Sequence, residues 1–206
     1  MKNEMTTGDF SEDMLTEARE KSENVEGLRF SYGDMRSVRL GEKFDVVAAL
    51  FHVLSYQTTN QDVLDAFTTV KEHLAPEGIA VLDFWYGPAV LTQQPEVRIK
   101  EVDNESVKIL RIAEPKMFYN QNAVDVNYHT FIFNKMTMQC QELKESHRMR
   151  FFSLPELHLI LDSLEISILF TAEWKTENNP DNTSWSAVIV CQKNECGFEV
   201  AAGPRL

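Results

Sequence analysis

Two carboxylates and a histidine follow short segments that we predict to be strands or strand ends in the first half of the chain. Asp9 precedes a helical segment, while Asp34 and His52 follow the strands predicted over 28–32 and 44–50. In open α/β sheets, ligands bind beyond the carboxyl ends of the strands, so these side chains are expected along one rim. A carboxylate there can accept hydrogen bonds from a ligand, and His52 could take a proton during a reaction.

Apolar and aromatic side chains accompany these polar groups at the same predicted rim. Aromatic ring faces attract cations, so a dry, ring-lined pocket suits a positively charged ligand. Each of these residues also has an ordinary structural interpretation: the aspartates as caps or turn residues, His52 as a satisfied polar group, and the rings as core packing. The residues concerned are Phe10, Met35, Leu50, Phe51, Tyr56, Trp85 and Tyr86.

A strand, a helix and a second strand are predicted to position this rim. The segment 44–50 is almost wholly apolar, which is typical of a strand buried on both faces of a parallel sheet. Asn60 is expected to cap the following helix, and Pro76-Glu77-Gly78 to form a turn before a buried strand over 79–84. This order predicts a right-handed βαβ unit.

The second half of the chain has a different pattern. From residue 94 to residue 152, apolar and polar residues alternate in segments rich in threonine, tyrosine, phenylalanine and valine, with a hairpin signal at Asn134-Lys135. We therefore expect an antiparallel cap over 94–152. A capping box at Ser153 begins a helix, and two apolar strands over 164–170 and 185–191 are expected to pair antiparallel.

Composition narrows the class of protein. The formal charge of −12 disfavours nucleic acid as a partner, because an acidic surface repels phosphate backbones. No membrane span is predicted, since no window approaches eighteen consecutive apolar residues. The three cysteines are too scattered for a disulfide framework or a metal site, so we expect no bound metal, and we expect a cytoplasmic location.

Four segments, in this order and spacing, carry a resemblance to a known family. They are Gly8-Asp9-Phe10-Ser11, Gly33-Asp34-Met35, the apolar strand and following residues over 44–56, and Leu74-Ala75-Pro76-Glu77-Gly78, the last with glutamate where the family pattern has its first glycine. Together they resemble the class I S-adenosylmethionine-dependent methyltransferases. The resemblance covers about 7–193 and is dense over the first half.

The resemblance implies a fold and a set of roles. The fold would be α/β, a Rossmann-like methyltransferase sheet truncated at its N-terminus, with the antiparallel cap inserted after the fifth family strand. The domain would span 7–193, followed by a tail over 194–206 of unknown role. S-adenosylmethionine would be the cofactor and a small amine, sugar or carboxylate the acceptor, with His52 as a possible catalytic base. The implied cofactor-binding residues are Asp9, Phe10, Asp34, Met35, Leu50 and Phe51, and the implied substrate residues are Tyr56, Trp85 and Tyr86.

One family feature is missing from this sequence. Such proteins normally begin with a strand that leads into a Gly-x-Gly loop, and no Gly-x-Gly occurs here. As a result, we expect two strand edges whose backbone N–H and C=O groups are unpaired. Three outcomes are open: the strands over 28–32 and 44–50 pair directly, another copy of the chain covers the sheet, or the fold is poorly stable. Two other functions stay open, a non-catalytic remnant or partner subunit and a dinucleotide-dependent enzyme.

Overall fold

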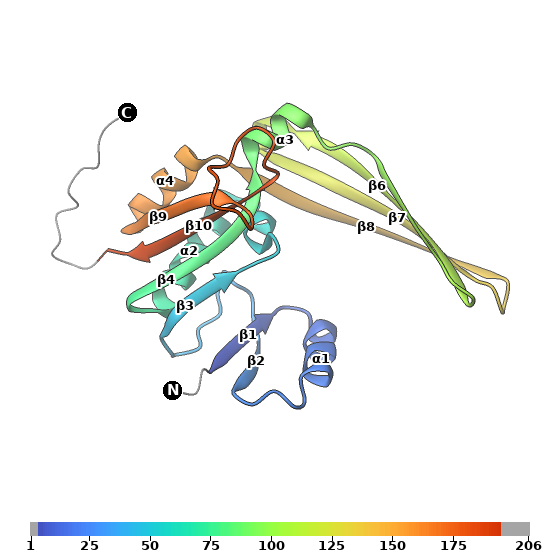
Figure 1. Ribbon diagram of the computed structural model, residues 1–206, viewed down its shortest axis with the longest axis horizontal. Coiled ribbons are helices and arrows are strands. Elements are labelled where there is room, and N and C mark those ends of the chain that lie inside the picture. Colours follow the sequence, from blue (N-terminus) through green and yellow to red (C-terminus); the bar gives the residue numbers. More distant parts are fainter. Residues whose placement is uncertain (1–3, 195–206) are drawn as a thin grey trace.

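The chain forms two separate sheets and four α-helices, in a computed structural model that describes residues 4–194 (Figure 1). A two-stranded sheet holds the N-terminal segment. An eight-stranded sheet has the order β5-β6-β7-β8-β4-β10-β9, with β3 paired to β4 beside this path. The mixture of parallel and antiparallel pairs agrees with the predicted α/β class.

The N-terminal unit consists of β1 (Met5–Asp9), α1 (Glu12–Lys21) and β2 (Leu28–Tyr32). The strands run parallel, and the Ser11 side chain caps α1 by accepting a hydrogen bond from the Met14 backbone N–H. The predicted strand over 28–32 is confirmed.

The other edge of β1 is unpaired within the described residues. The expectation that the strands over 28–32 and 44–50 pair directly is wrong: β2 pairs with β1, and β3 pairs with β4. The exposed ladder edges are therefore present on both β1 and β3. Coverage of these edges by a second copy of the chain stays a prediction.

The centre of the fold is a parallel βαβ unit, as predicted. It consists of β3 (Phe44–Ala49), the 3₁₀ turn η1 (Val53–Tyr56), α2 (Asn60–His73) and β4 (Leu74–Tyr86). The expected cap at Asn60 is wrong by one residue. Thr59 caps α2 through a capping box with Asp62, in which both orphan backbone N–H groups are satisfied.

The turn expected at 76–78 lies inside β4 as an irregularity in its pairing with β3. Glu77 has a φ of 61°, a backbone conformation that favours glycine. The family pattern has glycine at this position, and this chain accommodates glutamate in the same conformation. Gly78 must be glycine, because a Cβ there would lie 2.9 Å from the Phe44 carbonyl oxygen.

Four antiparallel strands form a long projection, which we call the arm. It consists of β5 (Arg98–Asp103), β6 (Val107–Phe118), β7 (Ala123–Asn134) and β8 (Gln139–Phe152), with the 3₁₀ turn η2 (Tyr119–Gln121) between β6 and β7. The arm extends away from the body of the molecule (Figure 1). At its base the C-terminal end of β8 pairs with β4, so the arm and the central sheet are continuous.

The remaining elements are α3 (Gly87–Gln93), α4 (Leu154–Ser163), β9 (Ile166–Glu173) and β10 (Ser186–Lys193). The capping box at Ser153 is confirmed, and β9 and β10 pair antiparallel as expected. No helix within residues 4–194 has the length and apolar character needed to cross a membrane. All but the first residue of the 194–206 tail lies outside the described residues.

The main core lies where α2 and α4 pack against the central sheet. Phe67 of α2 and Leu157 of α4 are fully buried with Leu82 and Phe84 of β4 and Ile189 of β10. Leu82 and Phe84 are two residues apart and so point to the same face of β4. Asp83 points to the opposite face, which matters for the site.

Candidate active site

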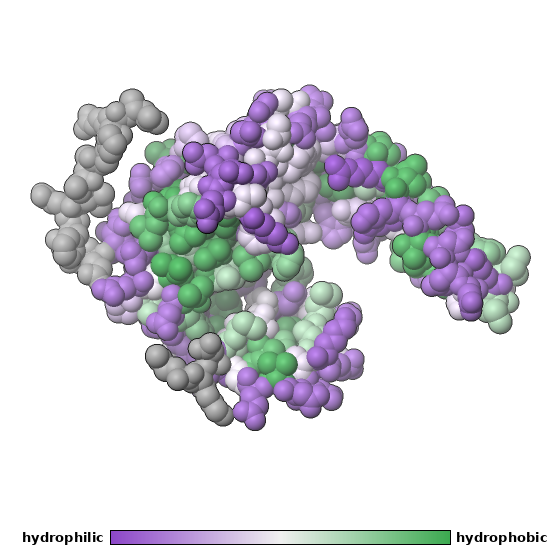
Figure 2. All heavy atoms as spheres, viewed as in Figure 1, coloured by the Kyte–Doolittle hydropathy of each residue, from purple (hydrophilic) through white to green (hydrophobic). Residues whose placement is uncertain are grey.

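The candidate active site lies where the body of the molecule is hollowed between the arm and the N-terminal unit (Figure 2). The carboxyl ends of β1 and β3 point toward the side from which the arm projects (Figure 1). The predicted residue Asp9 is the last of β1, and Asp34 and His52 follow β2 and β3. Trp85 is the second-to-last residue of β4.

His52 is fixed to β4 by a buried carboxylate. Its backbone N–H donates a hydrogen bond to Asp83 Oδ1 at 2.9 Å, and its ring Nδ1 lies 3.1 Å from Asp83 Oδ2, without the geometry of a hydrogen bond. Asp83 is only 1% exposed, whereas the His52 side chain is 31% exposed. The histidine can therefore meet a ligand from solvent while a carboxylate holds it from behind.

The backbone before η1 is strained. Phe51 and His52 both have a φ of 64°, the left-handed conformation that few non-glycine residues adopt. Such positions cost on the order of 1–3 kcal/mol each, and they cluster at functional sites. The hydrogen bond to Asp83 supports this conformation. The strain turns the chain sharply after β3 and leaves Phe51 80% exposed.

Asp34 is held in an ion-pair cluster with Arg36 and Asp62. Arg36 contacts both Asp34 oxygens, with Nε at 3.0 Å from each, and its Nη1 lies 2.9 Å from Asp62 Oδ1. The hydrogen bonds from Arg36 lower the pKa of Asp34, and the Asp34 carboxylate raises the pKa of Arg36. Because Asp62 belongs to the first turn of α2, this cluster ties the loop after β2 to the central unit.

Asp9 lies beside Asp34 at the end of the N-terminal sheet. Its backbone carbonyl accepts a hydrogen bond from the Gly33 N–H at 3.0 Å, and its carboxylate accepts one from the Ser11 N–H at 2.8 Å. The structural interpretation of Asp9 as a residue that shapes the helix entry is therefore satisfied, and its second carboxylate oxygen is available to a ligand.

The predicted apolar residues are divided between the rim and the core. Phe10, like Phe51, is mostly exposed, and Met35 and Leu50 are partly buried. Tyr86 packs in the main core, so its predicted contact with substrate finds no support from its burial. Trp85 lies at the rim, with its ring 6.4 Å from that of His52.

The arm adds two aromatic side chains that sequence reasoning did not select. His147 of β8 shares a 3.3 Å hydrogen bond between its Nδ1 and the Tyr56 hydroxyl, and its ring also packs edge-on against Tyr128 of β7 at 5.5 Å. Burial raises the pKa of Tyr56, so its hydroxyl stays protonated near neutral pH. Tyr56, predicted as a substrate residue, is thus where the arm meets the body.

Two further partners were also missed. The contact of Asp83 with His52 was not anticipated, and nothing in the sequence pairs Arg36 with both Asp34 and Asp62. Alternation in β7 and β8 could have put Tyr128 and His147 on one face, had the register between these strands been known.

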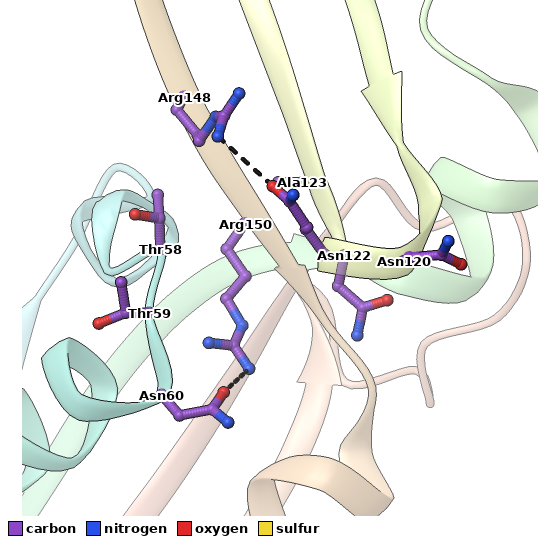
Figure 3. A pocket seen from close by; sticks show the side chains of 9 residues that line it. Thr58, Thr59, Asn60, Asn120, Asn122, Ala123, Arg148 and Arg150 are labelled. Atoms are coloured by element: carbon purple, nitrogen blue, oxygen red, sulfur yellow. Dashed lines mark hydrogen bonds between the residues drawn. The ribbon is translucent and has the colours of Figure 1, made fainter.

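A cavity of about 410 Å³ lies on the opposite face of β8, between the start of α2 and the base of the arm (Figure 3). Arg148 donates to Gln121 and Arg150 to Asn60 across it, and amide and hydroxyl groups form most of the remaining lining. Since His147 and Arg148 are consecutive in a strand, their side chains point to opposite faces. Arg148 and Arg150 thus line the cavity from the face of β8 opposite His147. Among residues 4–194, no group of three histidine, cysteine or acidic side chains is placed to hold a metal ion.

Comparisons with known proteins give matches to methyltransferases. Residues 1–78 match the family model described as "Methyltransferase domain". Over 80 residues, the chain is 38% identical to "dTDP-3-amino-3,4,6-trideoxy-alpha-D-glucopyranose N,N-dimethyltransferase" of Streptomyces venezuelae, a match that covers 39% of this chain and 32% of that protein. It is 24% identical to YqeM of Bacillus subtilis (strain 168) over 193 residues, or 93% of this chain and 76% of that protein.

Among solved structures, the fold is similar to an S-adenosylmethionine-dependent methyltransferase from Clostridium acetobutylicum ATCC 824. The TM-score is 0.79 at 18% identity, covering 94% of this chain and 76% of that one. This likeness supports the fold, and the family-model match over residues 1–78 includes Asp9, Asp34 and His52. The first 78 residues thus match a methyltransferase domain, and the fold is similar to that of S-adenosylmethionine-dependent methyltransferases.

Proposed function

We propose that this protein binds S-adenosylmethionine along the rim and transfers its methyl group to a small-molecule acceptor, an amino sugar or a related amine. The observation that carries the proposal is the strained Phe51–His52 turn, held on the buried Asp83 at the ends of β3 and β4. The matched part of the first curated relative is only about a third of its length, so the activity is inferred for this chain rather than transferred whole.

The residues at the rim fit the adenosyl part of the cofactor. Asp9 offers a carboxylate oxygen to a hydroxyl group. The Asp34 oxygens each accept two hydrogen bonds from Arg36, so Asp34 can receive an amino group when the Arg36 side chain moves aside. The exposed rings of Phe10 and Phe51 can cover a flat base or attract a cationic sulfonium. The methionine part would normally meet a glycine-rich loop, and this sequence contains no Gly-x-Gly.

When bound, the cofactor supplies an electrophilic methyl group. The protein must then align an acceptor nitrogen with it, which calls for positioning more than for acid–base machinery. Trp85, whose ring lies 6.4 Å from that of His52, and Tyr56 can orient the acceptor. His52, partly exposed and held by Asp83, can take the proton that an amine or hydroxyl loses. Asp83 acts only through His52 and is a positioning residue.

Calorimetry with S-adenosylhomocysteine tests cofactor binding. We expect binding to the unaltered chain and a loss of about tenfold or more in Asp34→Ala, because a charge-assisted hydrogen bond disappears. Asp103→Ala, which removes an exposed carboxylate at β5 in the arm, is the matched control and should bind like the parent. Binding unaffected by Asp34→Ala would reject the assignment of the adenosyl site.

A methyl-transfer assay with an amino sugar tests the role of His52. His52→Gln should lower the turnover rate by about a hundredfold while leaving cofactor affinity unchanged, as expected for loss of a general base. An unchanged rate would remove His52 from the mechanism.

A second candidate function, a non-catalytic methyltransferase-like protein or partner subunit, is favoured by one specific observation. The edges of β1 and β3 are unpaired within residues 4–194, so the rim is divided between two sheets. If the folded chain binds no S-adenosylhomocysteine at millimolar concentration, this candidate replaces the first.

A further inference from the structure

The two faces of the arm differ in charge pairing. In antiparallel strands, directly opposed residues share a face, as do residues two apart in one strand. The register therefore places His147, Tyr128 and Arg111 on one face, which we call the inner face because His147 contacts Tyr56 at the rim. Lys108, Lys144 and Arg148 fall on the other, outer face.

Cations on the outer face are balanced by acids. Lys108 pairs with Glu101 at 3.0 Å, Lys144 with Glu142 at 2.8 Å, and Arg148 with Asp125 at 2.6 Å. Five lysines and arginines on this face of the four strands are matched by five acidic residues. Such paired charges have little capacity left for a charged ligand.

The inner face carries cations without acidic partners. Arg98, Lys100 and Arg111 form no ion pair within the described residues, and Glu145 is the only acid on this face of β5–β8. Lys100 lies directly opposite Arg111 in the pairing of β5 with β6. In a chain of formal charge −12, this local excess of positive charge is the kind of surface that attracts an anionic ligand.

Arg111 is also held in place. Its guanidinium lies 5.0 Å from the centre of the Tyr128 ring, and it makes no ion pair within residues 4–194. A guanidinium stacked on a ring keeps its N–H groups directed outward, in the planar arrangement that matches a phosphate. Thr130, directly opposite Arg111, adds a hydroxyl on the same face.

Ring contacts connect these cations to the rim. The Tyr128 ring under Arg111 packs on His147, and His147 packs on Tyr56 at 6.0 Å between ring centres. A ligand that reaches from His52 along this surface would arrive at Lys100 and Arg111. Three cations on an otherwise acidic protein are too few for a long polyanion, but they suit one phosphate or diphosphate group.

We propose that the inner face of the arm binds the phosphate or diphosphate group of the methyl acceptor, with Lys100 and Arg111 as its main ligands and Arg98 beside them. This inference rests on the proposed function for the identity of the ligand as the acceptor. It deepens that function by making the acceptor a phosphorylated or nucleotide-linked small molecule, whose reacting end lies at His52 and whose anionic end lies on the arm.

Titration calorimetry with thymidine diphosphate and with inorganic pyrophosphate tests the proposal without any methyl transfer. The double variant Lys100→Gln/Arg111→Gln should bind thymidine diphosphate about tenfold or more weakly than the parent. The matched control, Lys108→Gln/Lys144→Gln, removes the same charge from the outer face and should bind like the parent. Circular dichroism checks that both variants are folded.

Several results would overturn the proposal. Equal affinity of the three proteins for thymidine diphosphate would reject Lys100 and Arg111 as its ligands. Equal weakening in both double variants would show that only the total charge of the arm matters. Tighter binding of a short oligothymidylate than of thymidine diphosphate, lost in the Lys100→Gln/Arg111→Gln variant, assigns the face to nucleic acid instead. S-adenosylhomocysteine binding in the same preparations separates the proposed function from the phosphate site on the inner face. If S-adenosylhomocysteine does not bind while thymidine diphosphate binding depends on Lys100 and Arg111, the proposed function fails and the phosphate site stands.

Discussion

Arg150 joins three elements at the base of the arm, and its removal should destabilise the protein strongly. It is 6% exposed and extends from β8, with Nη2 2.6 Å from Glu156 Oε1 in α4 and 2.8 Å from Asn60 Oδ1 in α2. Its guanidinium also lies 5.2 Å from the centre of the Phe152 ring. In Arg150→Met, the apolar stem is largely kept, while the charge and both hydrogen bonds are lost.

The expected loss in the free energy of unfolding is about 3 kcal/mol, because removing one partner of a buried ion pair leaves the other uncompensated. Arg148→Met is the matched control on the same strand. Arg148 is 42% exposed in its side chain and pairs with Asp125, so its removal should cost about 1 kcal/mol or less.

Urea unfolding measured by circular dichroism gives both values. The double variant Arg150→Met/Glu156→Gln should recover part of the loss, since the unpaired carboxylate is gone and glutamine can preserve the capping box at Ser153. Equal losses for Arg148→Met and Arg150→Met would refute the reasoning, as would a double variant no more stable than Arg150→Met.

Two further predictions follow from burial and charge. Burial raises the pKa of the Cys191 thiol to about 12, so iodoacetamide at pH 8 should label the exposed Cys140 and leave Cys191 unmodified until the protein is unfolded, as read by mass spectrometry. The pKa of Asp34 is lowered by Arg36, so its contribution to stability is present above the unfolded pKa near 3.8 and is lost as pH falls through the lower folded value. Asp34→Asn should therefore flatten the acid side of the stability profile, and an unchanged acid slope would contradict this.

The sequence predicted the central elements well because local signals and burial agree there. The apolar segment over 44–50 becomes β3, and the capping box at Ser153 begins α4. The cap of α2 was misplaced by one residue because Asn60 and Thr59 are both good capping residues, and only the Asp62 side chain selects Thr59.

Features that depend on pairing between strands could not be predicted. β5 lies within the cap predicted over 94–152, but its bounds could not be predicted because its six residues are all exposed and give no burial signal. The inner face of the arm exists only through the register that brings Lys100 opposite Arg111 and Tyr128 beside His147, and a shift of one residue would exchange the two faces. The predicted rim residues were found because strand ends are local, whereas their partners Asp83 and Arg36 act through tertiary contacts.

The division between the two sheets is the structural feature on which the proposed function depends most. Asp9 and Asp34 belong to one sheet, and His52 and Asp83 belong to the other, with no strand pairing between the two sheets in the described residues. The connection is instead made by side chains, chiefly Arg36 to Asp62.

Further contacts from the loop between β2 and β3 reinforce this connection. The Leu40 N–H donates to His73 Nε2 at 3.0 Å, and Arg39 contacts Thr69 and Glu72 of α2. Exposed ion pairs contribute at most about 1 kcal/mol each, far less than a row of ladder hydrogen bonds between buried strands. The distance between the two halves of the rim is therefore weakly fixed. A cofactor that contacts Asp34 on one side and His52 on the other must supply part of the energy that holds them together, so its affinity reports directly on how well the two sheets are joined.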